Sequence, residues 1–213
     1  MALEATHIRF ALDVRDEFGI ADVSRYLSGA IYPDSRYLTR VSRDLTHPKD
    51  FGSITLPKDD DFRKGWETHL IYDLIQGDVF AERTGKKDMV FGDEEWRVRT
   101  VFKVVQNGLD LAALDMSAVP GCLNVILTPF GESEEAVRTY FRSVSEFFEA
   151  GWTGIDEMPV FRAALSSDSD GTVRNILEDL AERYSDILGD AEAMDWLAGV
   201  YDETLRRYRA ISV

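Results

Sequence analysis

The sequence predicts an all-α protein, a multi-helix bundle that folds as a single domain over residues 1–213. Apolar residues recur at every third or fourth position along most of the chain, which is the period of an amphipathic helix. The one β-branched run, residues 119–129, is bounded by prolines and fits a short strand or, in this helical setting, a buried connector. No repeat, linker or low-complexity segment divides the chain.

The first predicted helix covers about residues 5–18, with Thr6 as its N-cap. The second covers about residues 20–31. A proline disfavours helical backbone in the residue before it. We therefore expect Pro33 to end the second helix and to leave Asp34 in a turn just beyond it.

Residues 35–59 show no helical period and are predicted to be irregular. Loops longer than about 12–15 residues are unusual, and the aromatic and aliphatic side chains of this one indicate order. A long helix begins at the acidic residues 59–61 and continues to about residue 80 or 83. The remaining predicted helices cover about residues 93–114, 133–150, 170–188 and 191–210. Core candidates of the first of these are Trp96, Val101, Val104, Val105, Leu109 and Ala112.

The formal net charge of −15 disfavours nucleic acid and anionic membranes as partners, because a broad acidic surface repels both. Residues 1–7 lead directly into an amphipathic pattern, so a signal peptide is not expected. No apolar run approaches the roughly 20 residues of a membrane span. A single cysteine, Cys122, excludes an internal disulfide and fits a reducing compartment. We expect a cytoplasmic protein, whose oligomeric state the sequence leaves open.

His69 and Asp73 lie four residues apart in the long predicted helix, and therefore on one face of it. The same face carries Trp66 and Leu70, so it is directed towards the interior. Burying a carboxylate is costly unless it is paired or bound to a metal. The pair therefore requires a partner, and the other two histidines of the chain are the candidates.

All three histidines fall in the first third of the sequence, together with two suitably placed aspartates. Imidazole and carboxylate ligands suit zinc, and also iron or manganese. A set of this kind is typical of catalytic sites that keep a position for water, whereas structural zinc sites more often use thiolates. The candidate metal ligands are His7, Asp34, His47, His69 and Asp73.

Two segments resemble the zinc-dependent phospholipase C-like superfamily, a group of all-α metal-dependent phosphoesterases. Residues 27–34, LSGAIYPD, look like its G-A-I-x-P-D segment, and residues 65–73, GWETHLIYD, are similar to its helix with the pattern H-x-x-x-D. In that superfamily an early helix supplies a histidine and the P-D segment an aspartate. The following loop supplies a second histidine, and the later helix supplies the final pair. The resemblance covers residues 1 to about 80. The single domain can accordingly be divided into a half of about residues 1–85, which carries the candidate metal site, and a half of about residues 86–213, which the resemblance leaves unmatched.

The resemblance implies a bundle of the phospholipase C or zinc nuclease type. It implies that His47, His69, Asp73 and Asp34 surround one ion, and that His7 binds this ion or a second one, with Asp73 as a bridge. Further ligands of the secreted members are missing here, since no histidine follows His69. One or two divalent ions, zinc foremost, are therefore expected rather than three.

The leading functional hypothesis is a hydrolase that acts on a small-molecule or lipid phosphoester through metal-activated water. Asp34 is the candidate for a ligand that also acts as general base. Three arginines close to it in sequence could hold the phosphate in bidentate geometry: Arg36, Arg40 and Arg43. One alternative is a non-catalytic helical binding or regulatory protein with a structural or vestigial metal site. Another is an interaction module in which these histidines and aspartates only pair with each other.

Overall fold

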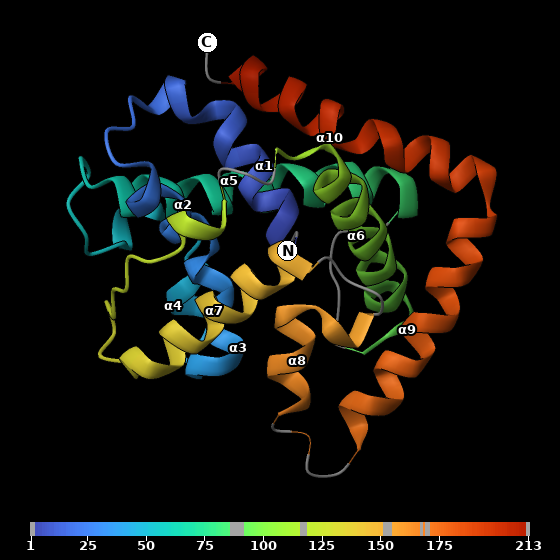
Figure 1. The fold of residues 1–213 in the computed structure, drawn as a ribbon. Helices are drawn as coiled ribbons and strands as arrows, with labels where there is room; N and C mark the ends of the chain where they lie inside the picture. The colour runs from blue at the N-terminus through green and yellow to red at the C-terminus, as the bar shows by residue number, and fades with distance from the viewer. Residues whose placement is uncertain are drawn as a thin grey trace.

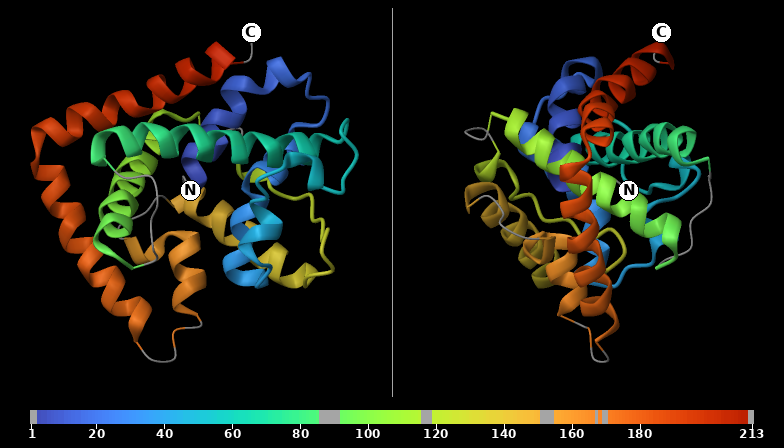
Figure 2. Two further views of the ribbon diagram at one scale, coloured as in Figure 1. Left: turned by 180° about the vertical axis from the view of Figure 1, so that it is seen from behind. Right: turned by 90° about the vertical axis from the view of Figure 1, so that its right-hand side faces the viewer.

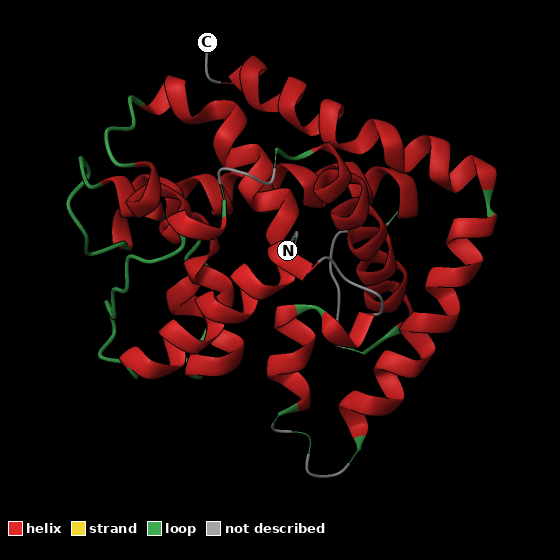
Figure 3. Cartoon of the chain, in the orientation of Figure 1, coloured by secondary structure: helices red, strands yellow, loops and turns green. Residues whose placement is uncertain are grey.

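The computed structural model describes residues 3–85, 92–115, 119–150, 155–166, 168 and 171–211. All regular structure in these segments is helical (Figure 3), which confirms the prediction of an all-α protein. The α-helices and the short 3-10 helices (η) are α1 (Glu4–Val14), η1 (Arg15–Phe18), α2 (Val23–Ile31), η2 (Tyr32–Ser35), α3 (Arg36–Thr39), α4 (Arg43–Thr46), η3 (Phe51–Ser53), α5 (Asp61–Thr84), α6 (Glu94–Ala113), η5 (Pro120–Cys122), α7 (Glu134–Ala150), η6 (Ile155–Glu157), α8 (Pro159–Leu165), α9 (Thr172–Gly189) and α10 (Ala191–Ile211).

The long helix α5 crosses the molecule, and α1, α2 and α10 pack against it (Figure 1). Helix α6 packs against α1, α9 and α10, while α7 and α8 pack with each other and with α3. Figure 2 shows α9 and α10 as two arms that meet at a corner and frame one side of the bundle. The main apolar cluster contains side chains from α1 and α2 through to α10. None of the described helices is both long and apolar enough to cross a membrane.

Helices α2 and α5 are in direct backbone contact at two glycines. A Cβ atom on Gly29 would lie 2.0 Å from the carbonyl oxygen of Phe62, and one on Gly65 would lie 1.9 Å from that of Tyr26. Any side chain larger than hydrogen would therefore push the two helices apart. This contact fixes α2, and the η2 turn that follows it, against the helix that carries His69.

The first helix is shorter than predicted and starts differently. It ends at Val14, and the η1 turn continues the chain to Gly19, whose φ of +58° closes the segment. Thr6 is not its N-cap: the Thr6 hydroxyl donates to Asp110 Oδ2 at 2.6 Å. The capping acceptor comes instead from α6, where Asn107 Oδ1 accepts from the Ala5 amide at 2.8 Å. A tertiary contact here replaces the local cap that the sequence suggested.

The second helix begins at Val23, after Asp22 caps the Arg25 amide at 3.0 Å, so the predicted start at residue 20 is too early. The expectation that Pro33 forces Tyr32 out of helical geometry is wrong, because Tyr32 has φ −53° and ψ −42°. Pro33 occupies the first turn of η2, where a missing amide hydrogen costs no hydrogen bond. Asp34 consequently lies within a helical turn and is buried.

Residues 35–59 are more regular than predicted, since they contain the single-turn helices α3 and α4 and the turn η3. Helix α5 starts after Asp60, which caps the Phe62 amide at 2.8 Å, and ends at Gly85 with φ +77°, close to the predicted bounds. Residues 119–130 form a connector with the turn η5 and no strand, but most of this connector is half-buried, not buried as predicted.

The later helices match their predicted ranges, but one additional helix is present and the buried residues of α6 differ from those predicted. Helix α8 was not predicted. In α6, Ala112 is exposed and Trp96 and Leu109 are only half-buried, although all three were core candidates. Polar side chains are buried there instead: Gln106, Asn107 and Asp110. Asn107 and Asp110 form hydrogen bonds with α1. The predicted first residue of α9, Asp170, lies outside the described residues.

Candidate metal centre

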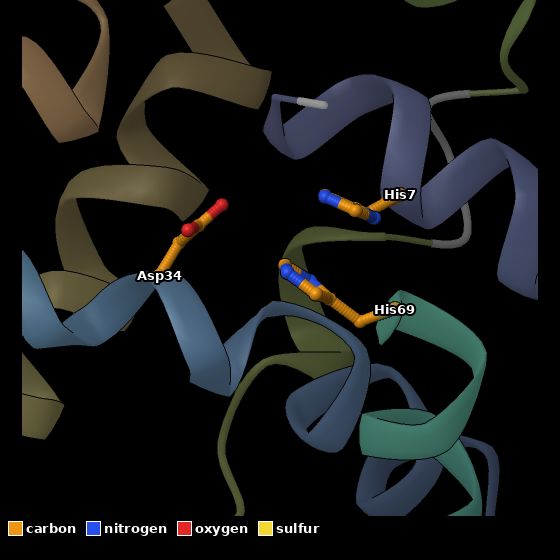
Figure 4. A group of neighbouring side chains, drawn as sticks. All are labelled: His7, Asp34 and His69. Carbon is orange, nitrogen blue, oxygen red and sulfur yellow. The ribbon is translucent and has the colours of Figure 1, made fainter. Parts of the chain in front are cut away.

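The structure brings all five predicted ligands together from four segments of the chain. His7 lies on α1, Asp34 in η2, His47 directly after α4, and both His69 and Asp73 on α5. Within the described residues, two groups of three have ligand atoms that all lie within 4.8 Å of one another: His7, Asp34 and His69, and His47, His69 and Asp73. Figure 4 shows the first group, with Asp34 directed towards the two imidazoles.

His69 belongs to both groups, and its protonation is fixed by the backbone of α2. Its Nδ1 lies 2.8 Å from the carbonyl oxygen of Ala30. A carbonyl only accepts, so Nδ1 carries a proton, and Nε2 carries a lone pair whenever the ring is neutral. Nε2 lies 3.8 Å from Asp73 Oδ2. The ring of His7 stacks on that of His69, with centroids 3.6 Å apart.

His47, from the loop after α4, reaches the same cluster. Its Nε2 lies 3.3 Å from His69 Nε2, 3.7 Å from Asp73 Oδ2 and 3.8 Å from Asp34 Oδ1. Asp73 also faces His7, whose Nε2 lies 3.6 Å from Asp73 Oδ1. Asp73 thus presents one oxygen to His7 and the other to His47 and His69.

Burial keeps His7 and His47 in the form that binds metals. Desolvation lowers the pKa of His7 well below its ordinary value, and lowers the pKa of His47 to about 2, with the neighbouring His69 adding to both effects. Both rings are therefore neutral, as a ligand must be. Burial also raises the pKa of Asp34 to about 6, against the opposing influence of His69. At neutral pH this carboxyl is mostly ionised and would gain from a cation.

Several ligand atoms have no hydrogen-bond partner among the described residues. They are both ring nitrogens of His7 and both carboxylate oxygens of Asp34, and both side chains are 1% exposed. An unsatisfied buried polar group costs about 1–3 kcal/mol, so such a set is unusual in a folded protein. A divalent cation would satisfy these atoms at once, and the donor set of imidazoles and carboxylates fits one.

The three predicted substrate arginines are placed differently. Arg36 is half-buried, its guanidinium lies 4.1 Å from the centroid of the Tyr37 ring, and its Nη2 donates to the Tyr37 hydroxyl at 2.7 Å. Its charge acts on both Asp34 and His47. Arg43 is exposed, and its charge also acts on His47. Arg40 is exposed at the end of α3 with a φ of +63°, and none of the described contacts joins it to the five ligands.

Lys103 on α6 is a neighbour of the centre that the sequence reasoning missed. It is 8% exposed. Burial lowers the pKa of its ammonium group, while the charges of Asp73 and Asp34 raise it. Its position inside the apolar run of residues 101–105 could have indicated a buried lysine. Because lysine is rarely buried without a partner, such a lysine indicates a nearby negative charge.

The loop that carries His47 is fastened to α5 at two places. The indole of Trp66 donates to the Thr46 carbonyl at 2.7 Å. The guanidinium of Arg63, which is 5% exposed, donates to three loop carbonyls at 2.7–3.1 Å, those of Phe51, Ile54 and Leu56. His47 is therefore held in a fixed position relative to His69 and Asp73 on α5.

Comparisons of the chain with protein-family models, with curated proteins and with solved structures gave no match.

Proposed function

We propose that this protein is a metal-dependent hydrolase of phosphoesters, with His7, Asp34, His47, His69 and Asp73 as ligands of one or two divalent ions. The observation that carries the proposal is the convergence of five metal-ligand side chains in one buried cluster, with unsatisfied atoms on two of them. Zinc is the first choice for this mixture of imidazole and carboxylate, and iron or manganese also suit it.

The geometry supports a division of the ligands. His47, His69, Asp73 and Asp34 lie around one position, with His47 Nε2 within 3.3–3.8 Å of an atom of each of the other three. His7 joins this position or completes a second one through Asp73, whose two oxygens face different histidines. The ratio of metal to protein distinguishes the two arrangements.

A bound divalent ion would supply a water of pKa about 7 and would polarise the phosphoryl group. Asp34 would accept the proton of that water, since its carboxylate is buried, lacks a hydrogen-bond partner in the described part of the chain and has a pKa raised to about 6. Arg36 binds the phosphate: its Nε is buried and has no described partner. Lys103 adds a second cation on the side of α6.

Access to the cluster is narrow. The side chain of Asp73 is 10% exposed and that of His47 is 4% exposed, whereas those of His69 and His7 are 0% and 1% exposed. Substrate therefore approaches from the side of Asp73 and His47, which is also the side nearest to the loop of residues 35–59.

The first experiment is elemental analysis of protein purified without a metal-binding tag, beside the variants His69→Ala and Arg40→Ala. We expect one or two equivalents of zinc, iron or manganese in the native protein and in the arginine control, and loss in the histidine variant. The metal-loaded protein is then assayed on p-nitrophenyl phosphate and bis-p-nitrophenyl phosphate. Native protein that stays metal-free after incubation with each ion would rule out the proposal.

A second candidate is a helical binding or regulatory protein in which the metal has a structural role. The near-complete burial of four of the five ligands favours it, because structural sites are closed to solvent. It predicts bound metal and a large loss of stability on chelation, but no turnover of any phosphoester.

A further inference from the structure

Thr46 is the residue before the metal ligand His47, and it is completely buried. Its hydroxyl oxygen lies 2.9 Å from His47 Nδ1 and 3.4 Å from the carbonyl oxygen of Arg43. A hydroxyl has one proton to donate but can also accept. It can therefore donate to the Arg43 carbonyl and accept from His47 Nδ1, or donate to His47 Nδ1.

These two arrangements give His47 different chemistry. If the hydroxyl accepts, Nδ1 carries the ring proton and Nε2 presents its lone pair to Asp34, Asp73 and His69. If the hydroxyl donates, the ring proton is on Nε2 and faces the lone pair of His69 Nε2, 3.3 Å away. His69 has no such choice, because the Ala30 carbonyl fixes its proton on Nδ1.

Each arrangement suits one state of the centre. Two lone pairs 3.3 Å apart repel each other without a cation between or beside them. The metal-free protein therefore favours the ring proton on His47 Nε2. A bound cation requires both Nε2 lone pairs, and the proton then has to be on Nδ1.

We propose that Thr46 positions His47 as a metal ligand: its hydroxyl donates to His47 Nδ1 in the metal-free protein and accepts from Nδ1 when an ion is bound. On binding, the ring proton moves from Nε2 to Nδ1 through water, and the hydroxyl proton turns to the Arg43 carbonyl. The number of protons on Thr46 and His47 is unchanged. This inference rests on the proposed metal centre and assigns a residue beyond its five ligands.

The test compares Thr46→Val, which keeps the shape and removes the hydroxyl, with Thr46→Ser, which keeps the hydroxyl. The backbone carbonyl that accepts from Trp66 is present in both variants. Loss of a hydrogen bond that orients a ligand typically lowers metal affinity about 10–100-fold. We expect that loss of zinc affinity in Thr46→Val, measured by competition with a chelating dye, and affinity close to native in Thr46→Ser.

A second measurement is made on the unmodified protein, and a variant serves only to assign the His47 signals. The ¹⁵N shifts of the His47 ring, assigned with a His47→Gln variant, report which nitrogen carries the proton. We expect the proton on Nε2 without metal and on Nδ1 with zinc. A proton on the same nitrogen in both states, or native affinity in Thr46→Val, would overturn the role of Thr46 while leaving the metal centre intact. Absence of zinc binding in the native protein would overturn both.

Discussion

His7 lies flat against His69, with ring centroids 3.6 Å apart and an angle of 14° between the ring planes. The two residues come from α1 and α5, so the stack joins the helices at the centre of the candidate site. Neither nitrogen of His7 has a hydrogen-bond partner in the described part of the chain. The ring therefore packs like an apolar side chain while retaining two polar atoms.

The variant His7→Phe separates these two properties. It keeps the aromatic stack and removes two unsatisfied buried nitrogens, each of which costs about 1–3 kcal/mol. Allowing for the larger ring, we expect metal-free His7→Phe to be more stable than the native protein by about 1 kcal/mol. We expect the variant to gain less stability from zinc than the native protein does, because one ligand is lost.

Urea unfolding of both proteins, with EDTA and with zinc, measures the two effects. A metal-free His7→Phe protein less stable than the native one would show that His7 makes compensating interactions. An equal zinc-induced gain in both proteins would exclude His7 from the ligands.

The contact between α2 and α5 gives a stability prediction with an internal control. A Cβ on Gly65 would lie 1.9 Å from the backbone of α2, whereas nothing lies within 4 Å of a Cβ on Gly77 of the same helix. We expect Gly65→Ala to cost roughly 3 kcal/mol or more through backbone displacement. Gly77→Ala should stabilise by about 0.5–1 kcal/mol, since alanine is the better helix former. Thermal or urea unfolding measures both, and equal effects would contradict the close approach.

The helical architecture was predictable because it depends on local periodicity, whereas its corrections come from tertiary contacts. Asn107 on α6 caps the first helix by accepting from Ala5, which is 102 residues away in the sequence. No local sequence pattern predicts such a cap. The burial of Asp110 instead of Ala112 has the same origin, because Asp110 binds Thr6 and Arg9 of α1. Helix α8, seven residues long, is too short to show a periodic pattern.

The clustering of the five candidate ligands was predictable because burying imidazoles and carboxylates requires a partner, and their chemistry suggests a shared one. The groups that support them were not predictable. The contact of Thr46 with the His47 ring, and that of Arg63 with the loop carbonyls, depend on how the loop folds. In the sequence, Arg63 resembles any surface arginine of a helix. Lys103 depends on the packing of α6 against α1, which the sequence does not reveal.

Glu4 gives the protein a dependence of stability on pH. It is buried, accepts from the Tyr140 hydroxyl at 3.1 Å, and burial raises its pKa from 4.5 to about 7. In the unfolded chain the carboxyl loses its proton near pH 4.5, but in the folded protein only near 7. The stability that comes from the protonated form is therefore complete below the unfolded pKa and is lost as the pH rises to about 7.

The variant Glu4→Gln resembles the protonated form at every pH. We expect it to be more stable than the native protein at pH 8, by at most about 3 kcal/mol, since one pKa unit corresponds to about 1.4 kcal/mol. The difference should shrink towards zero as the pH falls below 4.5, the pKa of the carboxyl in the unfolded chain. Urea unfolding from about pH 4 to 8 measures it, and a difference that does not vary with pH would disprove the raised pKa.

Arg63 is expected to determine the mobility of the loop that carries His47. It donates to the carbonyls of Phe51, Ile54 and Leu56 and pairs with Glu67 at 2.8 Å. Arg63→Met removes these bonds while keeping much of the apolar stem, at a cost of roughly 2–4 kcal/mol.

Hydrogen exchange measured by mass spectrometry should show faster exchange in residues 47–56 of Arg63→Met and unchanged exchange in α9 and α10. Zinc affinity should fall together with the protection of the loop, since His47 is then no longer held in place. Uniformly faster exchange over the whole chain would indicate global destabilisation instead.

Arg36 and Arg40 lie four residues apart and form a matched pair for a test of phosphate binding. The charge of Arg36 acts on Asp34 and its Nε has no described partner, whereas Arg40 is exposed and makes no described contact with the cluster. A charge-assisted hydrogen bond contributes about 1.5–3 kcal/mol, so Arg36→Gln should raise KM for the best phosphoester roughly 10–100-fold. Arg40→Gln should leave both KM and kcat unchanged. Steady-state kinetics on the metal-loaded proteins measures KM and kcat for both variants. Equal effects of the two substitutions would show that Arg36 contributes only general positive charge and does not bind the phosphate.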